Sequence, residues 1–164
     1  MLRRSTRKYL DTPVEPEKLE RVLRAAMQSP TGHNAQEWEF LVIREKETLR
    51  RISEISVDCV CTKNAPLAIV LLADRERAKV NLPLIWVCDL GAAAQTILIQ
   101  AEAEGLGAVW LSCWPYEEKV RAIREMFGLP EHITPYAVIP IGYKERIKPF
   151  DDRYDPDKIH WEHY

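Results

Sequence analysis

Apolar positions along the chain recur first at helical and then at strand spacing. In residues 17–27 the apolar side chains return every three or four positions, which predicts a helix with one buried face. Residues 38–43 are rich in β-branched and aromatic side chains and predict a strand. Residues 67–73 form a continuous apolar run, typical of a strand buried on both faces. The same reasoning predicts helices over 46–55, 84–104 and 117–127, and strands over 108–112 and 136–142.

These elements indicate a fold that mixes helices and strands, because the strands occur singly and each is followed by helical sequence. Pro140 lies within the last strand and has no amide hydrogen. We therefore expect a gap in one ladder there, with that strand at a sheet edge or carrying a bulge.

Residues 91–94 of the long helix are one glycine and three alanines. That helix is expected to be either the axis of the core or part of a subunit interface.

The final segment, residues 144–164, follows no helical or strand period although it contains four aromatic residues. A polar segment with large apolar side chains is better explained by docking on a surface than by burial in a core. That surface belongs either to the same subunit or to a partner, and a homodimer is our hypothesis. The aromatic residues are Phe150, Tyr154, Trp161 and Tyr164.

Composition excludes several broad classes of protein. The 164 residues are 46% hydrophobic with a formal net charge of -2, which fits one globular domain over residues 1–164. There is no basic excess of the kind that nucleic-acid readers carry. The apolar runs end well before the roughly 20 residues needed to cross a bilayer, and residues 1–5 are too polar for a secretory signal. We expect a cytoplasmic protein with neither nucleic acid nor membrane as a partner.

The four cysteines are too few for a disulfide framework in a chain of this length, and we expect them to remain thiols. Cys59 and Cys61 are separated by one residue, which is not the usual spacing of a zinc or dithiol motif. No metal site is predicted, and a metal held by cysteines is the alternative.

Two polar segments can carry chemistry. Residues 3–8 present four cations and two hydroxyls, enough to hold a phosphate through charge-assisted hydrogen bonds; a solvated basic face is the alternative. Residues 29–38 form a loop between a helix and a strand, and the amides of Asn34 and Gln36 can bind the edge of a flat heterocycle. In the alternative, Asn34 only caps the turn and Trp38 belongs to the core. The common nucleotide-binding and nucleophile motifs do not occur in the sequence.

The order of several segments resembles the flavin-dependent nitroreductase family, in its short form, over nearly the whole chain. The matching segments are residues 3–9, 25–30 with 34–38, 65–66, 89–98, 105–111, 127–130, 141–143 and 159–161. This resemblance implies an α+β fold with a central, mostly antiparallel sheet flanked by helices. It also implies an intertwined homodimer with FMN at each subunit interface and the C-terminal arm, residues 144–164, exchanged onto the partner subunit.

The resemblance further implies which residues contact the cofactor. The N-terminal segment would hold the FMN phosphate and reach the pyrimidine end of the ring. The loop after the first helix would contact the flavin of the other subunit, and the backbone near residues 111–113 would lie by the reactive ring nitrogen. The cofactor-binding residues implied in this way are Arg3, Arg4, Ser5, Arg7, Pro30, Thr31, Asn34, Gln36, Leu111, Ser112, Cys113 and Arg153.

The activity that the resemblance implies is ping-pong transfer of hydride from NADH or NADPH to a flat, electron-poor small molecule such as a nitroaromatic or a quinone. Because the flavin performs the chemistry, no acid–base residue is predicted, and Arg7 is the expected stabiliser of the reduced flavin. One alternative is a flavin enzyme with another acceptor, of the ene-reductase or dehalogenase type. Another is a flavin-free dimeric binding protein.

Two departures from the family pattern bear on the pocket. Glu37 stands where the family commonly has proline, and we expect this acid to narrow the pocket or disfavour anionic substrates. Ser112 and Cys113 replace a pair that usually contains glycine, which affects the expected ring contacts.

Overall fold

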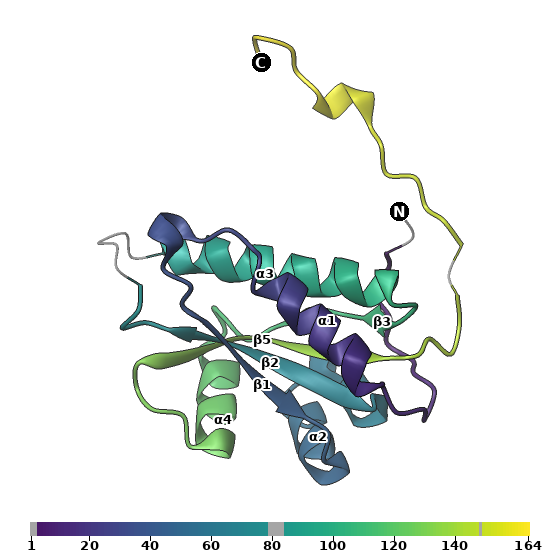
Figure 1. The fold of residues 1–164 in the computed structure, drawn as a ribbon, viewed down its shortest axis with the longest axis vertical. Coiled ribbons are helices and arrows are strands. Elements are labelled where there is room, and N and C mark those ends of the chain that lie inside the picture. Colours follow the sequence, from purple (N-terminus) through teal and green to yellow (C-terminus); the bar gives the residue numbers. More distant parts are fainter. Residues whose placement is uncertain (1–2, 79–83, 148) are drawn as a thin grey trace.

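The computed structural model describes residues 3–78, 84–147 and 149–164. An antiparallel sheet forms the middle layer of the molecule (Figure 1). Its strand order is β1-β2-β5-β3, and β4 also pairs with β5. The strands are β1 (Trp38–Ile43), β2 (Leu67–Asp74), β3 (Gly107–Ala108), β4 (Leu111–Ser112) and β5 (Ile133–Gly142).

Helices cover both faces of this sheet: α1 and α3 lie on one face and α2 and α4 on the other (Figure 1). Short 3-10 segments, η1 to η3, complete the secondary structure of the described residues. The bounds are α1 (Pro16–Ala26), η1 (Gly32–Asn34), α2 (Lys46–Ser53), η2 (Val57–Asn64), α3 (Ile85–Ala103), α4 (Glu117–Phe127) and η3 (Pro156–Lys158).

Strand β2 divides the hydrophobic interior into two cores. Leu67, Ile69 and Leu71 pack in the cluster that contains α1 and α3 residues, whereas Val70 and Leu72 pack in the cluster that contains α2 and α4 residues. Successive side chains of a strand point to opposite faces, so a strand between two cores is apolar at every position. All eight residues of β2 are buried, and the prediction of a strand buried on both faces is confirmed.

The predicted elements occur in the predicted order, with one strand divided. Residues 108–112 form two short strands, β3 and β4, rather than one. The registers Ala108↔Ile141 and Leu111↔Val138 place the interruption opposite Pro140. The expected ladder gap is therefore confirmed, since proline offers no donor there. Of the two alternatives for this strand, the edge position does not occur, because β5 pairs on both sides. The bulge does occur, because the register with β2 shifts between Leu71 and Leu72.

The small-residue stretch of α3 belongs to the core. Ala93 and Ala94 are fully buried beside Leu90 and Ile97. A methyl group added at Gly91 would meet the Tyr136 hydroxyl at 3.3 Å, so this turn of α3 lies close to β5. The prediction of α3 as a core axis is confirmed for this face of the helix.

The N-terminal segment runs along β3 as an additional, irregular edge of the sheet. Ser5 forms a parallel bridge with Ala108, and the Thr6 amide donates to the Ala108 carbonyl at 3.0 Å. A Cβ atom on Gly107 would lie 2.7 Å from Thr6 Cβ, closer than real Cβ contacts. Only a residue without a side chain at position 107 allows this segment to approach β3.

Gly107→Ala is therefore expected to push the N-terminal segment away from β3. The added methyl group would collide with Thr6 Cβ, which is bonded to the backbone and cannot move aside as the end of a long side chain could. The N-terminal segment therefore has to move. The expected loss is about 1–3 kcal/mol of stability, measured as a lower Tm, because overpacking costs of this order are usual. Gly105→Ala is a poor control because Gly105 has a positive φ of 76°, so Asp157→Glu, which adds one methylene group at an exposed position, serves instead. An unchanged Tm for Gly107→Ala would contradict the close approach.

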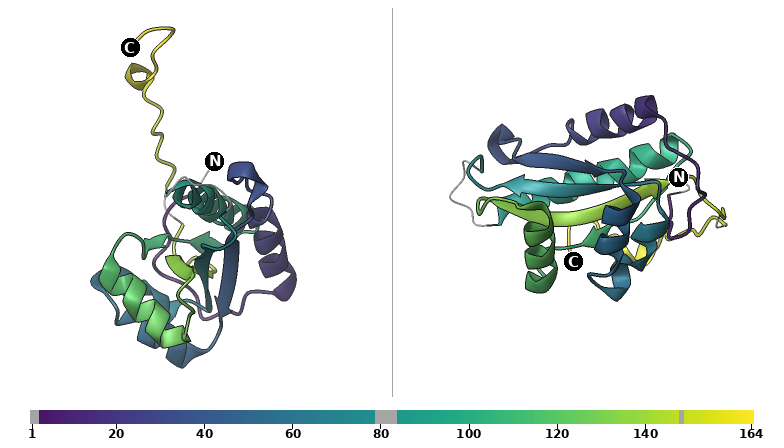
Figure 2. Two further views of the ribbon diagram at one scale, coloured as in Figure 1. Left: turned by 90° about the vertical axis from the view of Figure 1, so that its left-hand side faces the viewer. Right: turned by 90° about the horizontal axis from the view of Figure 1, so that it is seen from below.

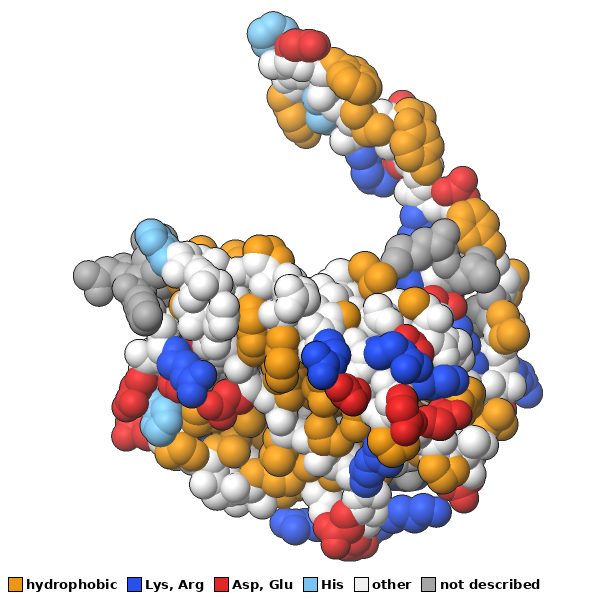
Figure 3. All heavy atoms as spheres, in the orientation of Figure 1, with side chains coloured by type: hydrophobic (Ala, Val, Ile, Leu, Met, Phe, Trp, Pro, Cys, Tyr) orange, Lys and Arg blue, Asp and Glu red, His pale blue; other side chains and the backbone are white. Residues whose placement is uncertain are grey.

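The C-terminal arm, residues 144–164, extends away from the body of the molecule (Figure 2). Lys148 within it lies outside the described residues. Hydrophobic side chains line the arm (Figure 3), and Phe150, Tyr154 and Trp161 are 61%, 73% and 78% exposed.

Among the described helices, none combines the length and apolar character that a bilayer span requires.

Candidate functional site

A cavity of about 550 Å³ lies between the N-terminal segment, η2 and the start of α4; we call it the η2–α4 cavity. It brings together three residues that the sequence reasoning selected, Arg7, Leu111 and Ser112. Elements far apart along the chain build it, because β4 pairs with β5 and the N-terminal segment pairs with β3. Its lining also includes Asp58, Cys61, Asn64, Trp110, Tyr116 and Lys119.

The η2–α4 cavity combines apolar walls with hydrogen-bonding groups. Asn64 and Ser112 can each donate and accept, and Arg7 is an exposed cation at its edge. The indole Nε1–H of Trp110 is buried and has no hydrogen-bond partner within the described part of the chain. Burial raises the pKa of the Cys61 thiol, with Arg7 opposing the rise, so Cys61 stays protonated at neutral pH.

Lys119 is a member of this cavity that the sequence reasoning missed. Its Nζ lies 3.1 Å from Asp58 Oδ2 and 4.5 Å from the centroid of the Tyr116 ring. Position 119 is one helical turn before the buried Ile123, on the inward side of α4. That spacing could have identified Lys119 as an inward-facing cation.

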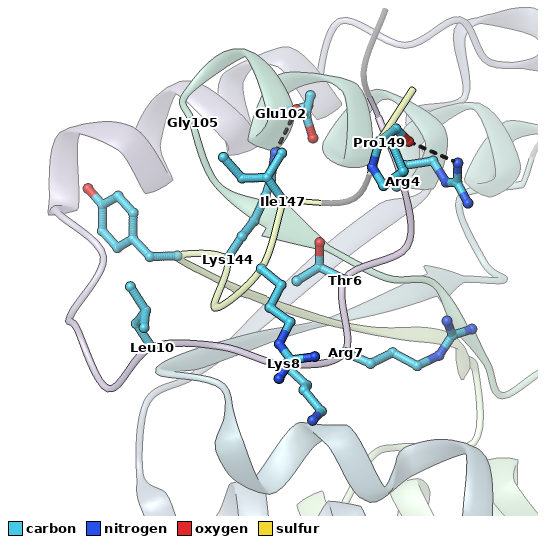
Figure 4. Close-up of a pocket in the computed structure, with 12 residues that line it drawn as sticks. Arg4, Thr6, Arg7, Lys8, Leu10, Glu102, Gly105, Lys144, Ile147 and Pro149 are labelled. Atoms are coloured by element: carbon cyan, nitrogen blue, oxygen red, sulfur yellow. Dashed lines mark hydrogen bonds and ion pairs between the residues drawn. The ribbon is translucent and has the colours of Figure 1, made fainter. Parts of the chain in front are cut away.

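A second cavity, of about 730 Å³, lies at the base of the arm on the N-terminal segment (Figure 4); we call it the arm-base cavity. It is strongly basic, since Arg4, Arg7, Lys8, Lys144 and Arg146 line it and Glu102 is its acidic residue. Lys144 Nζ lies 2.6 Å from Glu102 Oε1, which links the base of the arm to the end of α3. Arg7 borders both cavities, so the N-terminal segment separates them.

Arg4 and Arg153 meet through one carboxylate. Arg4 Nη1 lies 3.3 Å and Arg153 Nε lies 3.1 Å from Asp151 Oδ2. The first half of the arm therefore brings Arg153 to the basic N-terminal segment. Two guanidinium groups around one anionic group have the arrangement that a phosphate also favours.

The predicted loop residues Pro30, Thr31, Asn34 and Gln36 lie elsewhere. Gly32 N donates to Asp89 Oδ2 at 2.9 Å, in the first turns of α3, whereas the N-terminal segment lies near the other end of α3, by Glu102 and Gly105. An α3 of 19 residues is about 28 Å long. Within one chain, the loop and the N-terminal segment therefore do not form one site (Figure 1).

The backbone of this loop is held in an uncommon conformation. His33, Asn34 and Gln36 have positive φ values of 52°, 55° and 50°, in the left-handed region. The Gln36 side-chain amide donates to Asn34 Oδ1 at 2.8 Å, and the Gln36 backbone amide donates to Thr31 Oγ1 at 3.1 Å. Exposed polar side chains on a strained, internally bonded loop are typical of a binding element.

Glu37 does not belong to either cavity, which corrects the expectation that it narrows the pocket. Its side chain is fully buried, and neither carboxyl oxygen has a hydrogen-bond partner within the described residues. Burial raises the pKa of Glu37 to about 7, and the neighbouring Asp89 carboxyl adds to the rise. A buried acid pair therefore lies beneath the loop.

The remaining predicted site residues are Arg3, Ser5 and Cys113, and the contacts that the structure gives Ser5 and Cys113 are mainly through the backbone. Ser5 holds the N-terminal segment on β3, and Arg3 precedes it, partly exposed. Cys113 is buried, its amide donates to the Tyr136 carbonyl at 2.9 Å, and burial raises the pKa of its thiol to about 12. Each of the four cysteines, all within the described residues, is a free thiol.

The donor set of the η2–α4 cavity fits the pyrimidine end of a flavin. That ring edge carries two carbonyl acceptors and one imide donor. Arg7, Lys119 and Asn64 could donate to the carbonyls, and Asp58 could accept from the imide. The guanidinium groups of Arg4 and Arg153 fit a phosphate, as the N-terminal segment was expected to.

The chain is thus an α+β protein with two adjoining cavities, one partly apolar and one strongly basic. The nitroreductase family profile matches residues 1–86 and 61–143. A proposed NADH dehydrogenase/NAD(P)H nitroreductase of Archaeoglobus fulgidus is 41% identical over 163 residues, which cover 98% of this chain and 93% of the relative. The chain therefore belongs to the nitroreductase family of oxidoreductases.

Solved structures share the fold over almost the whole chain. A proposed NADH oxidase of Clostridium acetobutylicum superposes with a TM-score of 0.94 at 45% identity, covering 99% of this chain and 97% of the other. An FMN-dependent nitroreductase of Clostridium difficile superposes with a TM-score of 0.91 at 34% identity, covering 99% and 96%. The α+β fold with an antiparallel sheet and flanking helices is thereby confirmed.

Proposed function

We propose that this protein is an FMN-dependent oxidoreductase that takes hydride from NADH or NADPH and passes it to a flat, electron-poor small molecule such as a nitroaromatic or a quinone. The observation that carries the proposal is the η2–α4 cavity, which is lined by Arg7, Leu111 and Ser112, three of the residues that the family resemblance implies. Bound FMN would supply the hydride transfer, and the residues of the chain bind it, orient it and balance its charge.

Two parts of the chain would hold the cofactor at its two ends. Arg4 and Arg153, already gathered around Asp151, would exchange that carboxylate for the FMN phosphate. Arg7 would hold the pyrimidine end, with its guanidinium against a carbonyl oxygen. Because reduction places negative charge at that end, Arg7 would bind the reduced form more strongly than the oxidised form.

We also propose that the working unit is a homodimer with one site at each end of the interface. The loop that carries Asn34 and Gln36 contacts α3 at Asp89, whereas the N-terminal segment of the same chain lies near Glu102, roughly 20 Å further along the helix, so a second copy would have to supply the loop. The outward side of α3 suits such an interface, since Asp89 is the one charged residue between positions 85 and 101 and is buried. The exposed aromatic residues of the arm would dock on the partner.

The dimer has a direct test in sedimentation of the full chain. We expect a dimer at micromolar concentration, and Cys88→Arg, at an exposed position on α3, is expected to shift it toward monomer. A charge placed in an apolar interface has to be desolvated, whereas the same charge on a free surface costs little. Glu125→Arg, on α4, is the control and should remain dimeric. A monomeric wild-type protein would overturn the proposal.

The function itself is tested on the purified protein after reconstitution with FMN. We expect flavin absorption bands at one equivalent per chain, bleaching of those bands by NADH or NADPH without oxygen, and their return when a nitroaromatic or quinone is added. Return only with halogenated aromatics or activated alkenes would favour the dehalogenase or ene-reductase alternative. A protein that binds no FMN would be a binding protein on the same fold.

A further inference from the structure

Lys119 is buried to a degree that is rare for lysine. The residue is 5% exposed and its side chain 7% exposed, although it stands in the first turn of a surface helix. Burial of an ammonium group is costly unless it is compensated, so its position calls for a partner or a role. Within the described residues, its one carboxylate partner is Asp58.

The pair that Lys119 forms is electrostatically asymmetric. The Asp58 side chain is 67% exposed, whereas the Lys119 side chain is enclosed by the wall of the cavity and the Tyr116 ring. Water screens the exposed carboxylate more than the buried ammonium. Both side chains line the η2–α4 cavity, so the pair is formally neutral there, and the less screened ammonium is its stronger member.

The other cations that line this cavity, Arg7 and Lys8, are placed differently. Both are exposed, border both cavities and come from the N-terminal segment, while Lys119 is buried and comes from α4. Ser112, from β4, completes the lining on the sheet side. A flat ring in this cavity would thus have cations supplied by two independent elements.

We propose that Lys119 is the buried cation of the flavin ring site and that it stabilises the charge gained on reduction, with Asp58 limiting its effect. This inference rests on the proposed function. When hydride leaves the nicotinamide, NAD(P)⁺ is released and the ring gains two electrons and one proton, hence one negative charge. A buried cation facing the ring lowers the free energy of that charged state more than that of the neutral oxidised state.

The inference predicts opposite effects for the two members of the pair. Lys119→Met removes the cation while keeping an apolar side chain of similar length, so the ratio of affinities for reduced and oxidised FMN should fall at least tenfold. For a two-electron couple this is a midpoint potential about 30 mV more negative. Asp58→Asn removes the opposing charge and should raise the same ratio. Lys119→Arg should stay within threefold of wild type.

The experiment measures the midpoint potential of the FMN-loaded full-length protein against a reference dye, together with Tm and the Kd for oxidised FMN. Lys63→Met, an exposed lysine of η2, is the matched control and should leave the potential unchanged. A lower Tm for Lys119→Met with an unchanged potential would show a structural lysine and overturn the inference. Shifts of the same sign for Lys119→Met and Asp58→Asn would overturn it as well.

Two further outcomes separate this inference from the function on which it rests. If Lys119→Met does not fold, Asp58→Asn becomes the test. This variant changes an exposed side chain and is expected to shift the midpoint potential upward. An unchanged potential in that variant would overturn the inference. If the wild-type protein itself binds no FMN, the proposed function fails, and this inference falls with it.

Discussion

Replacement of Arg7 by alanine is expected to raise the Kd for FMN by a factor on the order of 10–100 and to slow reduction by NADH or NADPH. Arg7 borders the η2–α4 cavity beside Leu111 and Ser112, where its guanidinium would hold the pyrimidine end of the ring. Hydrogen bonds to charged groups contribute about 1.5–3 kcal/mol, which corresponds to that range of affinity. Fluorescence titration with FMN measures the Kd, and stopped-flow mixing measures the reduction.

Two variants show whether the effect is specific to the site. Arg7→Lys keeps the charge and loses the bidentate geometry, so it should recover part of the affinity. Arg24→Ala removes an exposed arginine of α1, paired with Glu20, and should leave the Kd unchanged. If Arg7→Ala binds and reduces FMN like the wild type, the role given to Arg7 is wrong.

Replacement of Glu37 by glutamine is expected to stabilise the protein at pH 8.5 by about 1–3 kcal/mol and to have little effect near pH 4.5. The folded protein raises the pKa of Glu37 from 4.5 to about 7, because the carboxyl is buried beside Asp89. Between these values the folded chain keeps a proton that the unfolded chain has lost. Stability therefore falls as the pH rises through this window and stays reduced above it. Glutamine cannot ionise, so the variant does not lose this stability at high pH.

Thermal unfolding at several pH values measures this difference. At pH 8.5 we expect Glu37→Gln to melt roughly 3–10 °C higher than the wild type, given about 2–4 °C per kcal/mol for a domain of this size. Glu39→Gln removes a partly exposed acid two residues along β1 and serves as the control. A wild-type Tm that follows the Glu37→Gln variant at every pH would show that Glu37 carries no buried charge.

Local patterns were sufficient to predict most of the fold. The strand over residues 38–43 and the helix over 117–127 match β1 and α4 at both ends, because each has one clear apolar period and flanking turn residues. The position of β5 could not be predicted in this way. Pro140 is tolerated in a paired strand because the ladder is interrupted opposite it, and that depends on how β3 and β4 approach from elsewhere in the chain.

The candidate site was predictable only in part. The basic residues 3–8 and the amides of the loop stand out in the sequence as polar clusters. That both clusters bind one cofactor was predicted only from the family resemblance. Lys119 was missed because a lysine in an amphipathic helix is ordinarily solvated, and its burial depends on η2 folding over the start of α4. The distance between the loop and the N-terminal segment depends on the length and direction of α3, which no local motif encodes.

The central claim is that each flavin site combines the N-terminal segment of one chain with the loop of a second. Its most direct test is FMN stoichiometry in a mixed dimer of Arg7→Ala and an Asn34→Ala, Gln36→Ala double variant, isolated with two different tags. We expect little FMN on either homodimer at a concentration that saturates the wild type. The mixed dimer should bind one FMN per two chains, because one of its two sites is intact. No FMN on the mixed dimer, with wild-type chains binding one each, would contradict the shared site.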